Sequence, residues 1–221
     1  MTQKQKKQLA LDVAAELEKI YPNAECALEW KGEAWKLLVM SRLSAQCTDK
    51  KVNAVSRPLF ERYPTPEEMA DADITELEEL VRPCGLYRMK AKNIRDSLRI
   101  LVDKHHGVLP SDMEELLALP GVGRKIANLL RGDVFGIGGV VTDTHFIRTC
   151  GRLGFYSERE KDPLRIEKLF TPLLPTELQT DFCHRIVWFG REFCTSQSPK
   201  CPQCPISHLC LKYSKDQNKK K

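Results

Sequence analysis

Apolar residues recur three or four positions apart along almost the whole chain, which is the spacing of one face of an α-helix. No segment alternates apolar and polar residues over the length of a strand. Residues 139–142, next to glycines, are interpreted as an extended connector. We therefore predict an all-α fold with short links between packed helices. The predicted helices cover residues 9–20, 35–43, 52–60, 74–81, 90–105, 113–119, 126–135, 144–153, 164–174 and 182–193.

Length, composition and charge narrow the class of protein. A chain of 221 residues can bury a full core, as one domain or as two small lobes. Its net charge of +5 is compatible with a nucleic-acid partner but does not establish one. The first apolar segment is interrupted by acidic residues and no stretch is long enough to cross a bilayer, so we expect an intracellular, soluble protein without a membrane partner. Residues 212–221 are polar and rich in lysine, and we expect them to be frayed or disordered.

A glycine-containing turn separates two of the predicted helices at residues 119–125, with the sequence Leu-Pro-Gly-Val-Gly-Arg-Lys. Gly121 and Gly123 flank Val122, so the chain can turn tightly and leave backbone N–H groups unobstructed. At the start of a helix such groups favour a phosphate and can grip a nucleic acid without reading its sequence. The alternative is a plain connection between helices, followed by a solvated surface charge at Lys125. The turn alone favours that alternative.

Asp143 lies eighteen residues after Lys125, just before the helix predicted from residue 144. Taken alone it is best interpreted as the N-cap of that helix. If it faces a lysine across a cleft, it can also help to deprotonate the amine and stabilise positive charge that develops on a sugar. The residues leave both interpretations open.

Four of the nine cysteines crowd near the C-terminus: Cys194, Cys201, Cys204 and Cys210, with six, two and five residues between them. Thiolates at this density suit zinc or an iron–sulfur cluster, and a Cys-x-x-Cys pair alone favours zinc. The other five cysteines lie in or beside predicted helices and are expected to fill apolar space.

Together these motifs resemble those of the endonuclease III family of DNA glycosylases. The turn with its lysine resembles the family's helix-hairpin-helix, and Asp-Thr-His at 143–145 its aspartate segment. Leu-Ser-Ala-Gln at 43–46 and Gly-Leu-Tyr at 85–87 resemble two further family segments, and the four cysteines resemble its 4Fe–4S loop. The resemblance implies a two-lobed helix-hairpin-helix glycosylase fold with a C-terminal iron–sulfur cluster loop. One domain covers residues 23–133, and the other covers 1–22 plus 134–221.

The resemblance also implies a mechanism. Lys125 attacks the sugar carbon that bears the damaged base, forms a Schiff base and promotes β-elimination, while Asp143 assists departure of the base. The implied activity is a bifunctional glycosylase and AP lyase of base excision repair. Its implied substrates are oxidised pyrimidines and abasic sites in double-stranded DNA. We expect a monomer inside the cell, in the cytoplasm or nucleoid if the protein is bacterial.

The implied DNA contacts come from the hairpin (Gly121, Val122 and Gly123) and from Gln46 and Leu86, which would fill the gap left by an extruded base. Alternatively, Leu86 belongs to the core and Gln46 assists a helix cap. Lys200 is the one basic residue between the first two cluster cysteines, where the family usually has several. Thr142 replaces an apolar residue that usually precedes the aspartate.

Two other functions stay open from the sequence. One is an adenine or mismatch glycosylase of the same superfamily, against which Lys125 and the lack of a long extra C-terminal domain both weigh. The other is a non-catalytic DNA-binding or redox-sensing protein, against which the presence of both Lys125 and Asp143 weighs.

Overall fold

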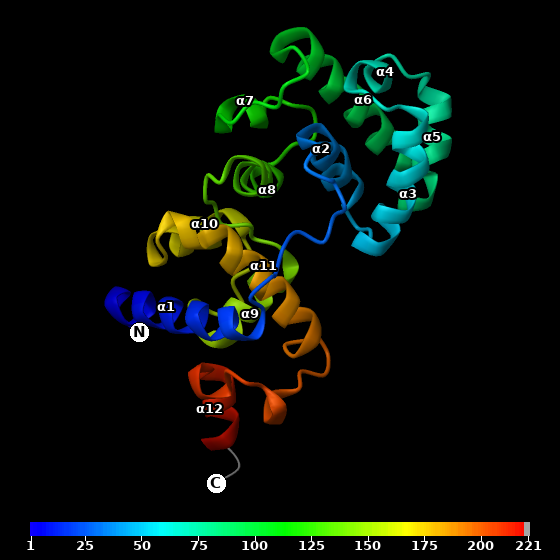
Figure 1. Ribbon diagram of the computed structural model, residues 1–221. Helices are drawn as coiled ribbons and strands as arrows, with labels where there is room; N and C mark the ends of the chain where they lie inside the picture. The colour runs from blue at the N-terminus through cyan, green and yellow to red at the C-terminus, as the bar shows by residue number, and fades with distance from the viewer. Residues whose placement is uncertain (219–221) are drawn as a thin grey trace. The chain divides into compact units, whose positions relative to one another are not determined.

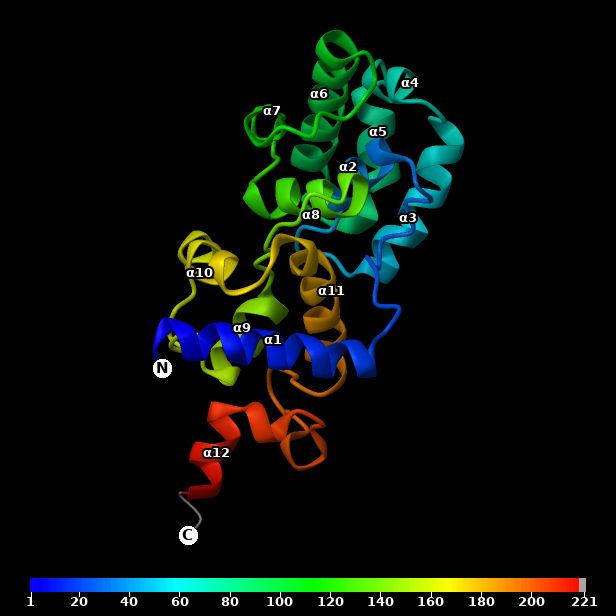
Figure 2. The same cartoon turned by 60° about the vertical axis from the view of Figure 1, so that its left-hand side comes forward.

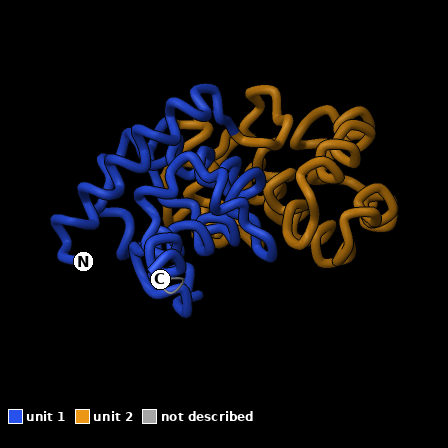
Figure 3. Tube along the Cα trace, turned by 90° about the horizontal axis from the view of Figure 1, so that it is seen from below, with its two compact units in different colours: residues 1–25, 136–221 blue, residues 26–135 orange. Residues whose placement is uncertain are grey.

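The computed structural model describes residues 1–218, which form helices and short 3₁₀ turns without a strand (Figure 1). The all-α prediction is confirmed, and residues 136–143 carry no regular secondary structure. Contacts divide the chain into two compact units, residues 26–135 and residues 1–25 with 136–221 (Figure 3). The resemblance implies divisions after residues 22 and 133, and that assignment of domains stays a prediction.

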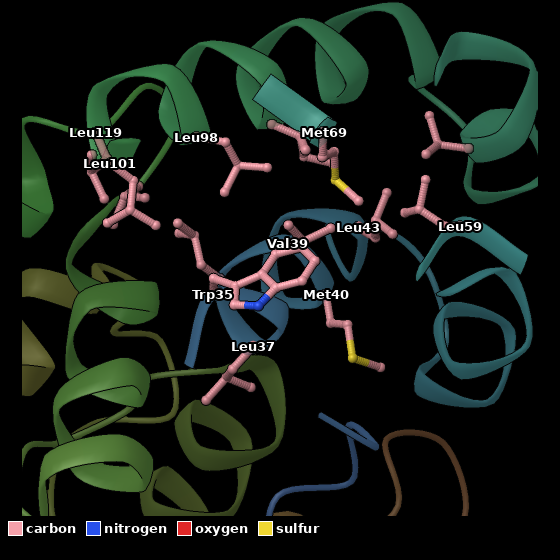
Figure 4. Packing of buried hydrophobic residues seen from close by; sticks show 14 of the residues in the cluster. Trp35, Leu37, Val39, Met40, Leu43, Leu59, Met69, Leu98, Leu101 and Leu119 are labelled. Atoms are coloured by element: carbon pink, nitrogen blue, oxygen red, sulfur yellow. The ribbon is translucent and has the colours of Figure 1, made fainter. Parts of the chain in front are cut away.

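The unit of residues 26–135 is built around a helix that is buried on all sides. Trp35, Leu37 and Leu43 of this central helix, α2, are buried (Figure 4), and helices α3, α6 and α8 pack against it. Burial on every face explains why α2 is almost uniformly apolar rather than striped. The elements of this unit are α2 (Ala34–Leu43), α3 (Asp49–Arg62), α4 (Pro66–Ala70), α5 (Ile74–Val81), η1 (Arg82–Cys84), α6 (Tyr87–His105), α7 (Met113–Leu117) and α8 (Arg124–Phe135).

The other unit packs around aromatic rings. Phe170 lies edge-on to Phe146 and to Phe155, with ring centroids 4.9 Å apart in each pair. Helix α11 packs against both α1 and α9 (Figures 1 and 2). The elements are α1 (Gln3–Ile20), α9 (Thr144–Leu153), α10 (Pro163–Phe170), η2 (Thr171–Leu173), α11 (Thr176–Glu192), η3 (Cys201–Gln203), η4 (Ser207–Leu209) and α12 (Leu211–Asn218).

Local sequence signals set many helix ends. The side chains of Thr48, Asp112 and Asp162 each accept a hydrogen bond from a backbone N–H in the first turn of the following helix. Each such cap contributes roughly 1 kcal/mol. The helix predicted for residues 164–174 ends at Phe170 instead, where a 3₁₀ turn containing Pro172 begins.

The expectation of a disordered tail is wrong for residues 212–218, which form most of α12. Packing explains the difference, since α12 contacts α9 and the side chain of Leu211 lies against Gly154. A Cβ atom at Gly154 would approach Leu211 to 2.8 Å, so the glycine leaves room for this contact. Residues 219–221 lie outside the described range.

Candidate active site

The hairpin between α7 and α8 is held to the rest of its unit through its carbonyl groups. Ser97 Oγ donates to the Pro120 carbonyl at 2.9 Å, and the Arg42 guanidinium donates to the Gly121 carbonyl. The Val122 N–H closes the turn by donating to the Leu119 carbonyl at 3.0 Å. Within residues 1–218, the N–H groups of Gly121 and Gly123 have no hydrogen-bond acceptor. The hairpin therefore presents two backbone donors that a partner can use.

The two hairpin glycines answer different requirements. Gly121 has φ +75°, and a Cβ there would collide with the side chains of Arg42 and Asn93. Gly123 has no positive φ, and a Cβ there would meet no atom within 4 Å. Of the two hairpin glycines, the fold therefore requires only Gly121, and a side chain at 123 would extend into open space. Sequence reasoning treated both glycines alike.

Val122 contributes to the core rather than to a binding surface. Its side chain is 6% exposed and belongs to the apolar cluster of its unit. Any contact of Val122 with DNA must therefore come from its backbone.

Lys125 and Asp143 both lie at the start of a helix. Lys125 is the second residue of α8, and its side chain is exposed. Asp143 is the N-cap of α9, and its Oδ1 accepts from the Phe146 N–H at 2.6 Å. The capping interpretation of Asp143 is therefore correct. It is compatible with the catalytic one, because the cap uses Oδ1 and leaves Oδ2 for chemistry. The two residues belong to different units, and their pairing stays a prediction.

Thr142, which precedes Asp143, is buried with 5% of its surface exposed. It stands between Val141 and Asp143 in a tight turn, in which the Asp143 N–H donates to the Val141 carbonyl at 3.0 Å. A buried position here would also accept the apolar residue that the family usually has.

Gln46 and Leu86 share a backbone conformation that is unusual for residues with side chains. Their φ angles are +53° and +49°, in the left-handed region, which costs on the order of 1–2 kcal/mol for each. Leu86 is 50% exposed, so the alternative that it belongs to the core is wrong. Gln46 is exposed too, and Thr48, not Gln46, caps the following helix. Lys31 and His106 are also exposed, with φ angles of +54° and +53°, so this conformation by itself assigns no function and only fixes the direction of the side chain.

The four clustered cysteines line one pocket together with apolar residues such as Leu153, Phe189 and Ile206. Within residues 1–218, no three His, Cys, Asp or Glu side chains are grouped tightly enough to hold a single metal ion directly. Four thiols spread around a pocket suit a cubane, which offers one iron to each cysteine. Burial raises the pKa of the Cys204 thiol to about 11, so the metal must supply the stabilisation of the thiolate.

Two arginines of α9, which sequence reasoning missed, anchor the cluster loop (residues 194–210). Arg148 Nε donates to the Cys194 carbonyl at 2.8 Å, and Arg152 donates to the Thr195 carbonyl at 2.7 Å. Arg152 also lies 3.4 Å from Cys194 Sγ. Their spacing of four residues on one helix was the available signal. Lys200 of the same loop is exposed, with Nζ 5.9 Å from the centroid of the Phe193 ring.

Two protein families and several relatives match this chain. HhH-GPD superfamily base excision DNA repair proteins match residues 39–176, and the iron-sulfur binding domain of endonuclease III matches residues 194–210. Endonuclease III of Synechocystis sp. is 43% identical over 206 residues, which is 93% of each chain. Endonuclease III of Bacillus subtilis is 40% identical over 201 residues, or 90% of each chain.

Solved structures give the same result. A non-covalent endonuclease III–DNA complex aligns with a TM-score of 0.89 at 40% identity and covers 99% of both chains. A trapped endonuclease III–DNA covalent intermediate aligns with the same score and identity over 98% of this chain and 99% of that one. A thermostable thymine-DNA glycosylase, 21% identical with a TM-score of 0.85, shares the fold.

Among residues 1–218, no helix combines the length and apolarity needed to span a membrane. The fold, the hairpin and the cluster loop agree with the family assignment, and the predicted iron–sulfur cofactor is confirmed over zinc. Cys194, Cys201, Cys204 and Cys210 are the residues that would hold it. The chain belongs to the endonuclease III family of the HhH-GPD superfamily and is a base excision repair DNA glycosylase and AP lyase with a 4Fe–4S cluster.

Proposed function

We propose that Lys125 is the nucleophile of this enzyme and that Asp143 assists it. The Lys125 amine forms a bond to the sugar carbon C1′ as the bond from C1′ to the base breaks, and the base leaves with a proton. Ring opening gives the iminium ion. Removal of a C2′ proton then expels the 3′ phosphate, which cleaves the strand. Asp143 stabilises the positive charge on the sugar and accepts a proton from the amine through Oδ2.

The observation that carries this proposal is the position of Lys125, exposed two residues after Gly123 and its unused N–H. A phosphate held by the Gly121 and Gly123 donors at the start of α8 would bring a nucleotide of the same strand near the amine. Cations bind phosphate by charge, whereas backbone donors also fix its position. The hairpin can therefore grip DNA of any sequence and leave the choice of substrate to the base pocket.

The substrate proposed is duplex DNA with an oxidised pyrimidine or an abasic site. The structures of endonuclease III in a non-covalent complex with DNA and in a trapped covalent intermediate with DNA support DNA as the ligand. Gln46 and Leu86 fill the space that an extruded base leaves, since both are exposed and held in fixed, strained conformations. The enzyme acts as a monomer inside the cell, where its DNA is. Lys200 adds one cationic contact from the cluster loop.

Borohydride trapping tests the nucleophile. Wild-type protein mixed with an abasic duplex and borohydride is expected to give a covalent adduct. Lys125→Ala and Lys125→Arg are expected to bind that duplex but to give neither adduct nor strand cleavage. Lys92→Ala, an exposed lysine on α6, is the matched control and should behave as wild type. An undiminished adduct in Lys125→Ala would remove Lys125 from the mechanism.

The base preference has its own assay. Duplexes that carry an oxidised pyrimidine, or adenine opposite guanine, are incubated with the wild-type protein. Preferential release of the oxidised pyrimidine is expected. Preferential release of adenine would instead favour the mismatch glycosylase of the same superfamily.

A further inference from the structure

Lys90 is a lysine buried in the interior of its unit, with 1% of its surface exposed. It lies in the first turn of α6 and has no part in the chemistry described above. Its ammonium donates to the Leu43 carbonyl at 2.8 Å, the Ala45 carbonyl at 2.7 Å and the Cys84 carbonyl at 2.8 Å. All three protons of the ammonium are therefore used, each on a backbone oxygen.

The three acceptors belong to two separate turns. Leu43 and Ala45 lie at the end of α2 and in the turn that leads to Gln46. Cys84 ends the η1 turn, two residues before Leu86. One cation thus joins the segments that carry the two strained, exposed side chains, although 40 residues separate these in the chain.

The positive charge of Lys90 makes its hydrogen bonds to these carbonyls stronger than those of a neutral donor. The last carbonyls of a helix lack partners inside it and carry partial negative charge, so an ammonium at the end of α2 interacts favourably with them. Burial lowers the pKa of Lys90, while the nearby thiols of Cys84 and Cys47 raise it and Arg42 lowers it. A buried charge is a poor way to gain stability alone, because an apolar side chain of the same volume often does as well. Its use lies in fixing one arrangement of the groups around it.

We infer that Lys90 is a positioning residue for base extrusion, which holds the turns of Gln46 and Leu86 in the register needed to enter the DNA stack together. The inference rests on the proposed role of these two side chains. Leu86 is the N-cap of α6 and has no side-chain cap, and both residues have the left-handed backbone conformation. Without the ammonium, each turn can relax to an ordinary conformation and withdraw its side chain. Extrusion of a paired base then becomes less favourable, while the reaction at Lys125 is unaffected.

The test uses Lys90→Met, which keeps the length of the side chain and removes its charge and donors. Lys92→Met, two residues along the same helix and exposed, is the matched control. Each protein is assayed on two substrates: a duplex with a paired oxidised pyrimidine, and single-stranded DNA with an abasic site, in which no stack has to be opened. For Lys90→Met we expect kcat/KM on the duplex to fall by about tenfold or more, and strand cleavage of the single strand to stay within about twofold.

A second readout follows the stack itself. With 2-aminopurine next to the lesion, wild-type protein should raise the fluorescence on binding because the base loses its neighbour. Lys90→Met should give a smaller rise at saturating protein, and Lys92→Met the full one. Equal losses on both substrates would mean that Lys90 only supports the fold and would overturn the inference. Unchanged activity on both would overturn it as well.

Variants of Gln46 and Leu86 distinguish the positioning role of Lys90 from the proposed role of these two side chains in base extrusion. Gln46→Ala with Leu86→Ala should show the same duplex-selective loss, and Lys90→Met added to that pair should reduce duplex activity little further, because it acts through side chains already removed. Should the pair lose nothing on the duplex, their proposed role and the inference both fail. A loss in the pair but none in Lys90→Met rejects the inference alone.

Lys90→Arg and Lys90→Gln keep the test decisive if Lys90→Met does not fold. Arginine retains the charge, but its planar fork cannot point a proton at three separate carbonyls as an ammonium does. Glutamine retains two donors. Both should lose duplex activity selectively, with Lys90→Arg affected less. Equal loss on both substrates in either folded variant rejects the inference.

Discussion

The hairpin of residues 118–123 and the cluster loop of residues 194–210 both connect helices, but different interactions hold them in place. The hairpin depends on backbone geometry: a positive φ at Gly121 and carbonyls bonded to Ser97 and Arg42. The cluster loop contains only the short turns η3 and η4. It is held by the arginines of α9 and by four cysteines around an apolar pocket. The hairpin leaves backbone N–H donors free to bind a partner, whereas the cysteines of the cluster loop line an apolar pocket. Substitutions in the cluster loop should therefore mainly reduce cofactor content and stability, and substitutions that block the hairpin donors should mainly reduce DNA binding.

The largest effect is expected from loss of a cluster ligand. Cys204→Ala leaves three thiols, and the cluster supplies much of the free energy that orders the loop. The variant should lose its iron and its brown colour, and its unit should unfold at a much lower temperature. Iron analysis and thermal unfolding measure this. A variant that keeps about four irons per chain would show that Cys204 is not a ligand.

Asp143 separates capping from catalysis. Asparagine caps helices as well as aspartate, so Asp143→Asn should keep its stability and lose about 10²–10⁴ of the rate of base release. Asp143→Ala should lose similar activity and in addition about 1 kcal/mol of the free energy of unfolding. Single-turnover rates and denaturant unfolding measure the two quantities. Full activity in a stable Asp143→Asn would reduce this residue to its cap.

The sequence predicted these regions unequally, for physical reasons. Helix positions follow from the period of apolar residues, which burial of one face enforces. The crowding of four cysteines indicates a metal site but leaves zinc and an iron–sulfur cluster open, and the resemblance decided between them. Neither the left-handed backbone of Gln46 and Leu86 nor the burial of Lys90 carries a local signal. Each depends on contacts between segments that are distant in the chain.

For the C-terminal segment the sequence signal was present but misleading. Its composition favours disorder, whereas residues 211–218 form a helix that packs against α9 and η4, with Leu211 against Gly154. The site residues Lys125 and Asp143 came from the resemblance, because an exposed lysine and a capping aspartate are ordinary features of any helical protein.

The two hairpin glycines should give different results, with intermediate effects. Gly121→Val forces a β-branched residue to φ +75° against Arg42, which should cost roughly 1–3 kcal/mol of stability. Gly123→Val meets open space, but Gly123 directly precedes α8 and its carbonyl accepts from the Ala127 N–H, an N-cap position that favours glycine over valine, so we expect a loss of at most about 1 kcal/mol of stability. Its side chain should nevertheless obstruct the phosphate and weaken binding to every DNA sequence alike. Unchanged affinity in Gly123→Val would mean that the hairpin only connects its helices.

Lys200 should give the smallest effect, because it is one exposed charge on a loop that the cysteines already order. If it contacts a phosphate, Lys200→Gln should lower the slope of log affinity against log salt by about 0.9, without sequence preference and with the cluster intact. Lys212→Gln is the matched comparison, since its ammonium lies 3.7 Å from the Glu158 carboxylate and should contribute less to DNA binding. If only Lys212→Gln changes the slope, the phosphate contact belongs to the segment after the cluster. The cluster loop would then serve the fold alone, and the hairpin would be the principal grip on DNA.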